Sequence, residues 1–299
     1  MKSATIFLSL LSLLLWLPSC TLQAQDREAT EKINKEFTLT GSAGSSTLAL
    51  YNIFGSVTVQ GYTGKTVVVE ITKTIKAPSP ELLEQGKKEA QPGFEQHGDS
   101  VLLYVAGPQD SRPNRDRQQN GRFRDNWSNT ERPRYSYQFD FVVKVPAGME
   151  VRASTVNGGR VLVQNVTGPL QARNVNGPVS IQNAQQATLA HTVNGDVDVS
   201  YAAAPTKPSS YHTINGNIVV SYPANVSADL YFKSMHGEMY TDFPQAEILP
   251  ARVTQNQQRE GQSTKYKISK ETAVRLGKGG TDFRFETLNG NVTIKQQTR

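Results

Sequence analysis

Two histidines have the residue type and the spacing that could bind a metal. His191 and His212 each stand four residues before the glycine of an Asn-Gly pair, so stacked repeats would bring them together. Imidazole nitrogen is a common ligand of zinc. Arg173 and Lys233 occupy the same position in the neighbouring repeats, however, and their positive charges repel a cation. We therefore expect an exposed ladder of side chains, with no metal site and no cofactor.

Three acids could do a different chemistry, the acid–base cleavage of polysaccharides. Asp196, Asp198 and Glu238 are the acids next to the glycine corners, and alternation places Asp196 and Asp198 on one strand face. Such enzymes need several carboxylates gathered with a partner base, and the pattern supplies no base. The chain also lacks a nucleophile elbow, a P-loop, a dinucleotide fingerprint, a zinc motif and the calcium-binding nonapeptide repeat. We predict no catalytic residues and no enzymatic activity.

The elements that position these side chains are repeats of a short Val-Asn-Gly motif. Its glycines recur every 18 to 21 residues from Gly158 to Gly237, with a longer gap before Gly290. The corner residues of the predicted structural repeat are Asn157, Gly158, Asn176, Gly177, Asn194, Gly195, Asn215, Gly216, Asn289 and Gly290. Asparagine and glycine both tolerate positive φ, so the pair predicts a tight turn in each repeat.

Each position of the repeat keeps one kind of residue. The third residue before the glycine is a small hydrogen-bonding one, such as Thr155 or Thr192, and apolar residues alternate after the glycine, as in Val197 and Val199. Like residues stack on like residues in a solenoid, where they form ladders. The sequence thus predicts an all-β fold, a single-stranded β-solenoid (β-helix) with coils of about 19–21 residues. A row of antiparallel hairpins with Asn-Gly turns is the alternative.

The first residues predict export. Lys2 precedes an apolar run from Ile6 to Leu17, which is too short to span a bilayer and is typical of a signal peptide over residues 1–24. Cleavage after Ala24 is favoured. The alternative is a lipobox in which Cys20, the single cysteine, is lipidated and tethers the protein to a membrane. The formal charge of +6 is mild, and we expect no nucleic-acid partner.

Between the leader and the repeats, residues 26–146 predict a strand-rich segment with one short helix near Ser79. Residues 107–135 form a polar, basic insertion with seven arginines, interpreted as a solvated loop or as an arm that docks on an anionic partner. The repeat region covers residues 147–299.

The stretch Val145 to Val151, the following Asn-Gly repeats and the closing segment Leu276 to Gly290 resemble the putative-adhesin family of bacterial envelope proteins, a domain of unknown function with β-strand repeats. The resemblance implies a β-solenoid and a location in the periplasm, outer membrane or cell surface. We expect an adhesin-like protein that presents a binding or structural surface to a glycan or an envelope protein. The alternatives are a periplasmic partner in envelope sensing and, less favoured, a polysaccharide-active β-helix enzyme.

Overall fold

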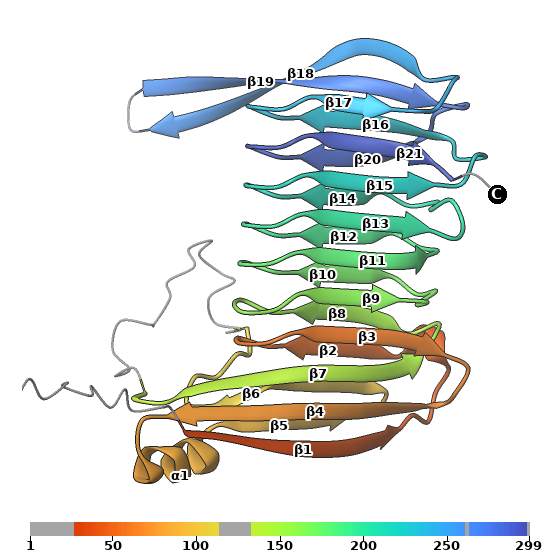
Figure 1. The fold of residues 1–299 in the computed structure, drawn as a ribbon. Coiled ribbons are helices and arrows are strands. Elements are labelled where there is room, and N and C mark those ends of the chain that lie inside the picture. The colour runs from red at the N-terminus through yellow and green to blue at the C-terminus, as the bar shows by residue number, and fades with distance from the viewer. Residues whose placement is uncertain (1–26, 114–132, 261–262, 298–299) are drawn as a thin grey trace, which may run out of the picture.

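The computed structural model describes residues 27–113, 133–260 and 263–297, without the side chains of residues 252–270. These residues form an all-β fold of two large sheets that pack face to face, with one α-helix at the N-terminal end (Figure 1). Both sheets are open and mixed: their strands pair in parallel along the repeats and antiparallel near the ends. The predicted signal peptide over residues 1–24 and Cys20 both lie outside the described residues.

One sheet has ten strands. In their order across the sheet they are β1 (Arg27–Thr38), β4 (Thr66–Ala77), β7 (Ser136–Pro146), β3 (Val57–Tyr62), β9 (Val161–Gln164), β11 (Val179–Ala184), β13 (Val197–Tyr201), β15 (Ile218–Tyr222), β21 (Val292–Gln296) and β17 (Met239–Thr241).

The other sheet has eleven strands. In order they are β18 (Glu247–Glu260), β19 (Ser263–Leu276), β16 (Ala228–Lys233), β20 (Thr281–Glu286), β14 (Ser209–His212), β12 (Thr188–His191), β10 (Leu170–Arg173), β8 (Glu150–Ser154), β2 (Thr47–Tyr51), β6 (Ser100–Gly107) and β5 (Gln91–His97). A short 3-10 helix, η1 (Ala43–Ser45), precedes β2.

Each repeat contributes one strand to each sheet, and we call such a pair of strands a level. In the level of β12 and β13, the chain leaves the eleven-stranded sheet, turns at Asn194-Gly195 and enters the ten-stranded sheet. Val197 lies between Val179 and Ile218 of the adjoining levels, all three buried and paired in parallel. The two strands flanking an Asn-Gly corner therefore belong to different sheets, and the alternative of antiparallel hairpins at these corners is wrong.

The order of the levels departs from the order of the sequence at both ends. The last repeat, β20 with β21, lies between the level of β14 and β15 and the level of β16 and β17. The chain therefore forms the outer level, β16 with β17, first. It then forms the antiparallel hairpin β18–β19 and returns to place β20 and β21 between the two earlier levels. Near the N-terminus, β2 and β3 likewise lie between β6/β7 and β8/β9. The longer gap between Gly237 and Gly290 that the sequence showed contains β17, this hairpin and the returning strand β20.

The N-terminal segment and the repeats share both sheets and one continuous hydrophobic core. The predicted helix is confirmed as α1 (Pro80–Glu89), whose first turn is capped by the Ser79 hydroxyl accepting from the Leu82 main-chain nitrogen. It packs beside β4 and β1 at the base of the stack (Figure 1). Within the described residues, no helix has the length and apolar character needed to cross a bilayer.

Candidate functional site

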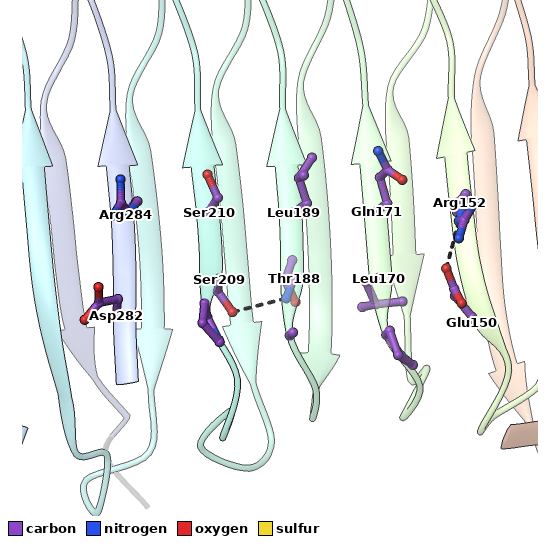
Figure 2. Close-up of a pocket in the computed structure, with 13 residues that line it drawn as sticks. Glu150, Arg152, Leu170, Gln171, Thr188, Leu189, Ser209, Ser210, Asp282 and Arg284 are labelled. Carbon is purple, nitrogen blue, oxygen red and sulfur yellow. Dashed lines mark hydrogen bonds and ion pairs between the residues drawn. The ribbon is translucent and has the colours of Figure 1, made fainter. Parts of the chain in front are cut away.

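A shallow hollow lies on the outer face of the eleven-stranded sheet and has a volume of about 350 Å³. It crosses five neighbouring strands: β8, β10, β12, β14 and β20 (Figure 2). Its lining residues are Glu150, Arg152, Pro169, Leu170, Gln171, Ala187, Thr188, Leu189, Pro208, Ser209, Ser210, Asp282 and Arg284.

Alternation along short parallel strands explains why these side chains meet. Strand residues that point inward, such as Val151 and Ala153, are buried in the core, and the residue between them points outward. Since the strands pair in register, the outward residues form one row across the sheet. That row reads Arg152, Gln171, Leu189, Ser210 and Arg284.

Charge is confined to the two ends of the hollow (Figure 2). At one end, Glu150 accepts a hydrogen bond of 2.7 Å from the Arg152 guanidinium; Asp282 and Arg284 lie at the other. The outward residues between them, Gln171, Leu189 and Ser210, are neutral. The Thr188 main-chain nitrogen donates to the Ser209 hydroxyl at 3.1 Å beneath this surface, where both residues are buried. Such a surface can contact an extended molecule through van der Waals and neutral hydrogen-bond contacts. The sequence pattern gave no signal for it.

The predicted corner asparagines form a hydrogen-bonded ladder along one edge of the stack. The Nδ2 atom of Asn194 donates to the Oδ1 atom of Asn176 at 2.8 Å, and Asn215 donates to Asn194 at 2.7 Å. Asn157 and Asn289 continue the ladder with bonds of 2.6 and 2.7 Å. These amides are occupied with one another, so the ladder is a structural element of the exposed edge.

The corner conformation differs from the sequence-based expectation. The glycines do have positive φ, but the corner asparagines do not; the non-glycine residues with positive φ in the described chain are Asn165 and Asn183, at the opposite edge. The asparagine at each Asn-Gly corner is therefore explained by its side-chain ladder. At four of the five corners the glycine is explained by close stacking: a Cβ atom on Gly216, for example, would lie 2.0 Å from the Gly195 carbonyl oxygen, whereas one on Gly158 would meet no atom nearer than 3.9 Å.

Buried threonines form hydrogen bonds to the same corners from the core side. The Thr192 hydroxyl donates to the Gly177 carbonyl oxygen of the adjoining level at 2.8 Å, and Thr213 donates to Gly195 at 2.9 Å. Both threonines are fully buried. The hydroxyls thus satisfy corner carbonyls that would otherwise be buried without a donor.

The acids proposed for polysaccharide cleavage are not gathered into a site. Asp196 and Asp198 are both exposed, and an Asp196 carboxylate oxygen accepts from the Asn217 main-chain nitrogen at 2.7 Å. Glu238 accepts from the Tyr240 hydroxyl on the outermost level. Asp196 thus has a role in joining adjacent corners, and the absence of catalysis stays a prediction.

The two histidines do meet, but in a geometry unsuited to sharing an ion. Their rings stack with centroids 4.5 Å apart and planes 28° apart, between Arg173 on one side and Glu286 on the other. Metal sites need ring nitrogens that converge on one point. Among the residues that the structure describes, no three His, Cys, Asp or Glu side chains cluster as a metal site would require.

The stacked histidines should make stability depend on pH. Burial, His212 and Arg173 lower the pKa of His191 below its ordinary value of 6.5. The folded protein then binds fewer protons than the unfolded chain as pH falls through 6.5, so acid favours unfolding. We expect the Tm to decrease from neutral pH to about pH 5, and the decrease to be smaller in His191→Gln. Thermal denaturation across this range checks it; identical slopes in the two proteins would contradict it.

Of the predicted basic insertion, residues 114–132 lie outside the described residues, and the described parts are anchored. Arg112 donates to Asp110 and Glu95 and lies over the Tyr104 ring at 4.4 Å. Tyr135 is buried, and its hydroxyl donates to Glu89 on α1 at 2.6 Å. The segment joins β6 to β7, the place that an Asn-Gly corner takes in the repeats.

Comparisons with known proteins give weak likenesses only. No family model matches this chain, and no curated protein does. Solved structures that it resembles include a "putative cell adhesion protein" from Clostridium sporogenes (TM-score 0.43, 11% identity, covering 90% of this chain and 100% of that one). A "putative adhesin" from Bacteroides fragilis has a TM-score of 0.38 at 10% identity, over 89% and 97%. A "putative lipid binding protein" from Parabacteroides distasonis has a TM-score of 0.29 at 8% identity, over 89% and 97%. At these scores the likenesses carry no functional argument.

Proposed function

We propose that this chain is an exported β-solenoid of the bacterial envelope that works by binding, without catalysis. The observation that carries the proposal is the in-register parallel pairing of outward residues across successive levels. Parallel stacking of this kind builds the long, continuous surfaces by which repeat proteins bind. Sheet strands and a shared core hold that surface rigid, which lowers the entropic cost of binding.

The chemistry of the hollow favours a neutral, extended ligand. Its centre offers the Gln171 amide, the Ser210 hydroxyl and the Leu189 side chain, and its charges lie at the ends. A charged polymer would find no continuous row of opposite charge there. Among the predicted partners, a neutral glycan fits this surface better than an acidic one.

Glycan-array binding tests the proposal with a matched pair of variants. Leu189→Arg places a charge at the centre of the hollow, whereas Leu162→Arg places the same charge on the outer face of the ten-stranded sheet. We expect Leu189→Arg to weaken binding to neutral glycans by at least about tenfold, or about 1.4 kcal/mol, and Leu162→Arg to leave it unchanged. Equal effects of the two variants would place binding elsewhere.

Turnover separates binding from the enzymatic alternative. We expect polysaccharides incubated with the full protein to remain intact, whatever their charge. Product formation that is lost in Asp196→Ala would overturn the non-enzymatic part of the proposal.

A test for lipid on Cys20, combined with cell fractionation, would decide between surface adhesion and a periplasmic sensing role.

A further inference from the structure

Five of the six Asn-Gly pairs are chemically labile sequences that the fold places in similar corners; the sixth, Asn120-Gly121, lies outside the described residues. An asparagine followed by glycine deamidates when the glycine main-chain nitrogen attacks the asparagine side-chain carbonyl carbon, because glycine offers no side chain to hinder the approach. Asparagine is a recognised source of instability in proteins for this reason. The rate at each corner thus depends on how firmly the structure holds the glycine nitrogen.

Four of the five glycine nitrogens are held by hydrogen bonds to the adjoining level. Gly177 donates to the Asn194 carbonyl oxygen at 2.8 Å, and Gly195 donates to that of Asn215 at 2.9 Å. Gly216 and Gly290 donate in the same way, at 3.0 and 3.1 Å. Attack by any of these nitrogens requires that an inter-level hydrogen bond be broken first.

The fifth corner, Asn157-Gly158, is different because Gly159 is inserted after it. The Gly158 main-chain nitrogen finds no acceptor among the residues that the structure describes. Its φ of +75° also sets it apart from the other four corner glycines, which have φ between +151° and +159°. Asn157 is moreover the end of the amide ladder: its Oδ1 accepts from Asn176 at 2.6 Å, but its Nδ2 donates to no described residue.

We propose that Asn157-Gly158 is a site of spontaneous modification, at which this asparagine deamidates ahead of the other four. The Gly158 nitrogen forms a bond to Cγ of Asn157, the bond from Cγ to Nδ2 breaks, and the displaced nitrogen leaves as ammonia with the proton of the Gly158 amide. Solvent water then opens the cyclic imide at either carbonyl carbon and yields aspartate or isoaspartate. The reaction needs no oxidant or reductant.

The two products should differ in their effect on the fold. Aspartate retains an oxygen that can accept from Asn176 and keeps the main chain intact. Isoaspartate adds a backbone atom at a residue whose nitrogen donates to Ile53 at 2.7 Å and whose carbonyl accepts from Gly55 at 2.9 Å. These bonds join the first Val-Asn-Gly level to the level of β2 and β3, so isoaspartate should loosen that junction.

Peptide mapping by mass spectrometry of the full folded protein, aged at mildly alkaline pH, tests the proposal. We expect the Asn157 peptide to gain the mass of amide-to-acid conversion at least about tenfold faster than the peptides of the other four corner Asn-Gly pairs, the factor expected when one hydrogen bond need not be broken. In denaturant, the five rates should approach one another. Asn157→Gln should abolish the fast site and leave the other four rates unchanged. Equal rates in the folded protein, or a different corner reacting first, would overturn the proposal.

Discussion

Replacing Gly216 with alanine is expected to lower the free energy of unfolding by about 2–4 kcal/mol, through overpacking against main-chain atoms. The new Cβ atom would lie 2.0 Å from the Gly195 carbonyl oxygen and 2.5 Å from its carbon. Neither level can move aside at low cost, because the Gly216 nitrogen donates to Asn289 and the Gly195 oxygen accepts from the Thr213 hydroxyl. Chemical denaturation of both proteins measures the loss.

Gly44→Ala is the matched control for this prediction. A Cβ atom on Gly44 meets no atom within 4 Å, so the substitution should change stability by less than about 0.5 kcal/mol. If Gly216→Ala were as mild as Gly44→Ala, close stacking of the corners could not be the reason for glycine at that position.

The pairing of like residues could be read from the sequence because every level uses the same chemistry. Val179, Val197 and Ile218 occupy one inward position, and the structure places them side by side. Burial of one sheet face demands this alternation wherever a strand occurs, so a single sequence contains the signal. The apolar and threonine positions carried most of the prediction.

The order of the levels could not be predicted, for the same physical reason. If all levels present the same inward residues, any level can stack on any other with similar energy. Val292 of the last repeat pairs with both Ile218 and Met239, and nothing in its residue type distinguishes this place from the end of the stack. The position of the last repeat depends on the segment that connects it to the previous one, in particular on the β18–β19 hairpin. This hairpin pairs with β16 at the end of the eleven-stranded sheet.

The hollow escaped prediction because its residues do not repeat. Arg152, Gln171 and Leu189 occupy one outward position in three successive levels, yet share neither charge nor polarity. Outward side chains do not pack in the core, so their residue types can differ from level to level. They therefore leave no repeated pattern in the sequence. The corner asparagines could be found in the sequence because their side chains hydrogen-bond to one another, which requires the same residue type in each level.

The second large effect is expected at Tyr211, in the core between the two sheets. Its hydroxyl lies 2.6 Å from that of Tyr201 and 2.9 Å from that of Tyr222, and all three side chains are fully buried. Burial raises the pKa of Tyr211 well above its ordinary value, so the group stays neutral. Its ring also stacks on Phe285 of the inserted level, with centroids 4.9 Å apart.

Tyr211→Ala should therefore cost about 3–5 kcal/mol, since it leaves a cavity and removes two hydrogen bonds at once. Tyr211→Phe separates the two contributions, because it keeps the ring against Phe285 and removes only the hydroxyl. The Tyr222 hydroxyl then loses the partner it has in the described structure, which should lower the free energy of unfolding by about 1–3 kcal/mol. Tyr240→Phe is the control, because that tyrosine is exposed and its hydroxyl bonds only at the surface. Equilibrium denaturation should rank the losses alanine, then phenylalanine at Tyr211, then Tyr240→Phe near zero. If Tyr211→Phe matched Tyr240→Phe, the buried hydroxyls would contribute nothing, and stability there would come from ring packing alone.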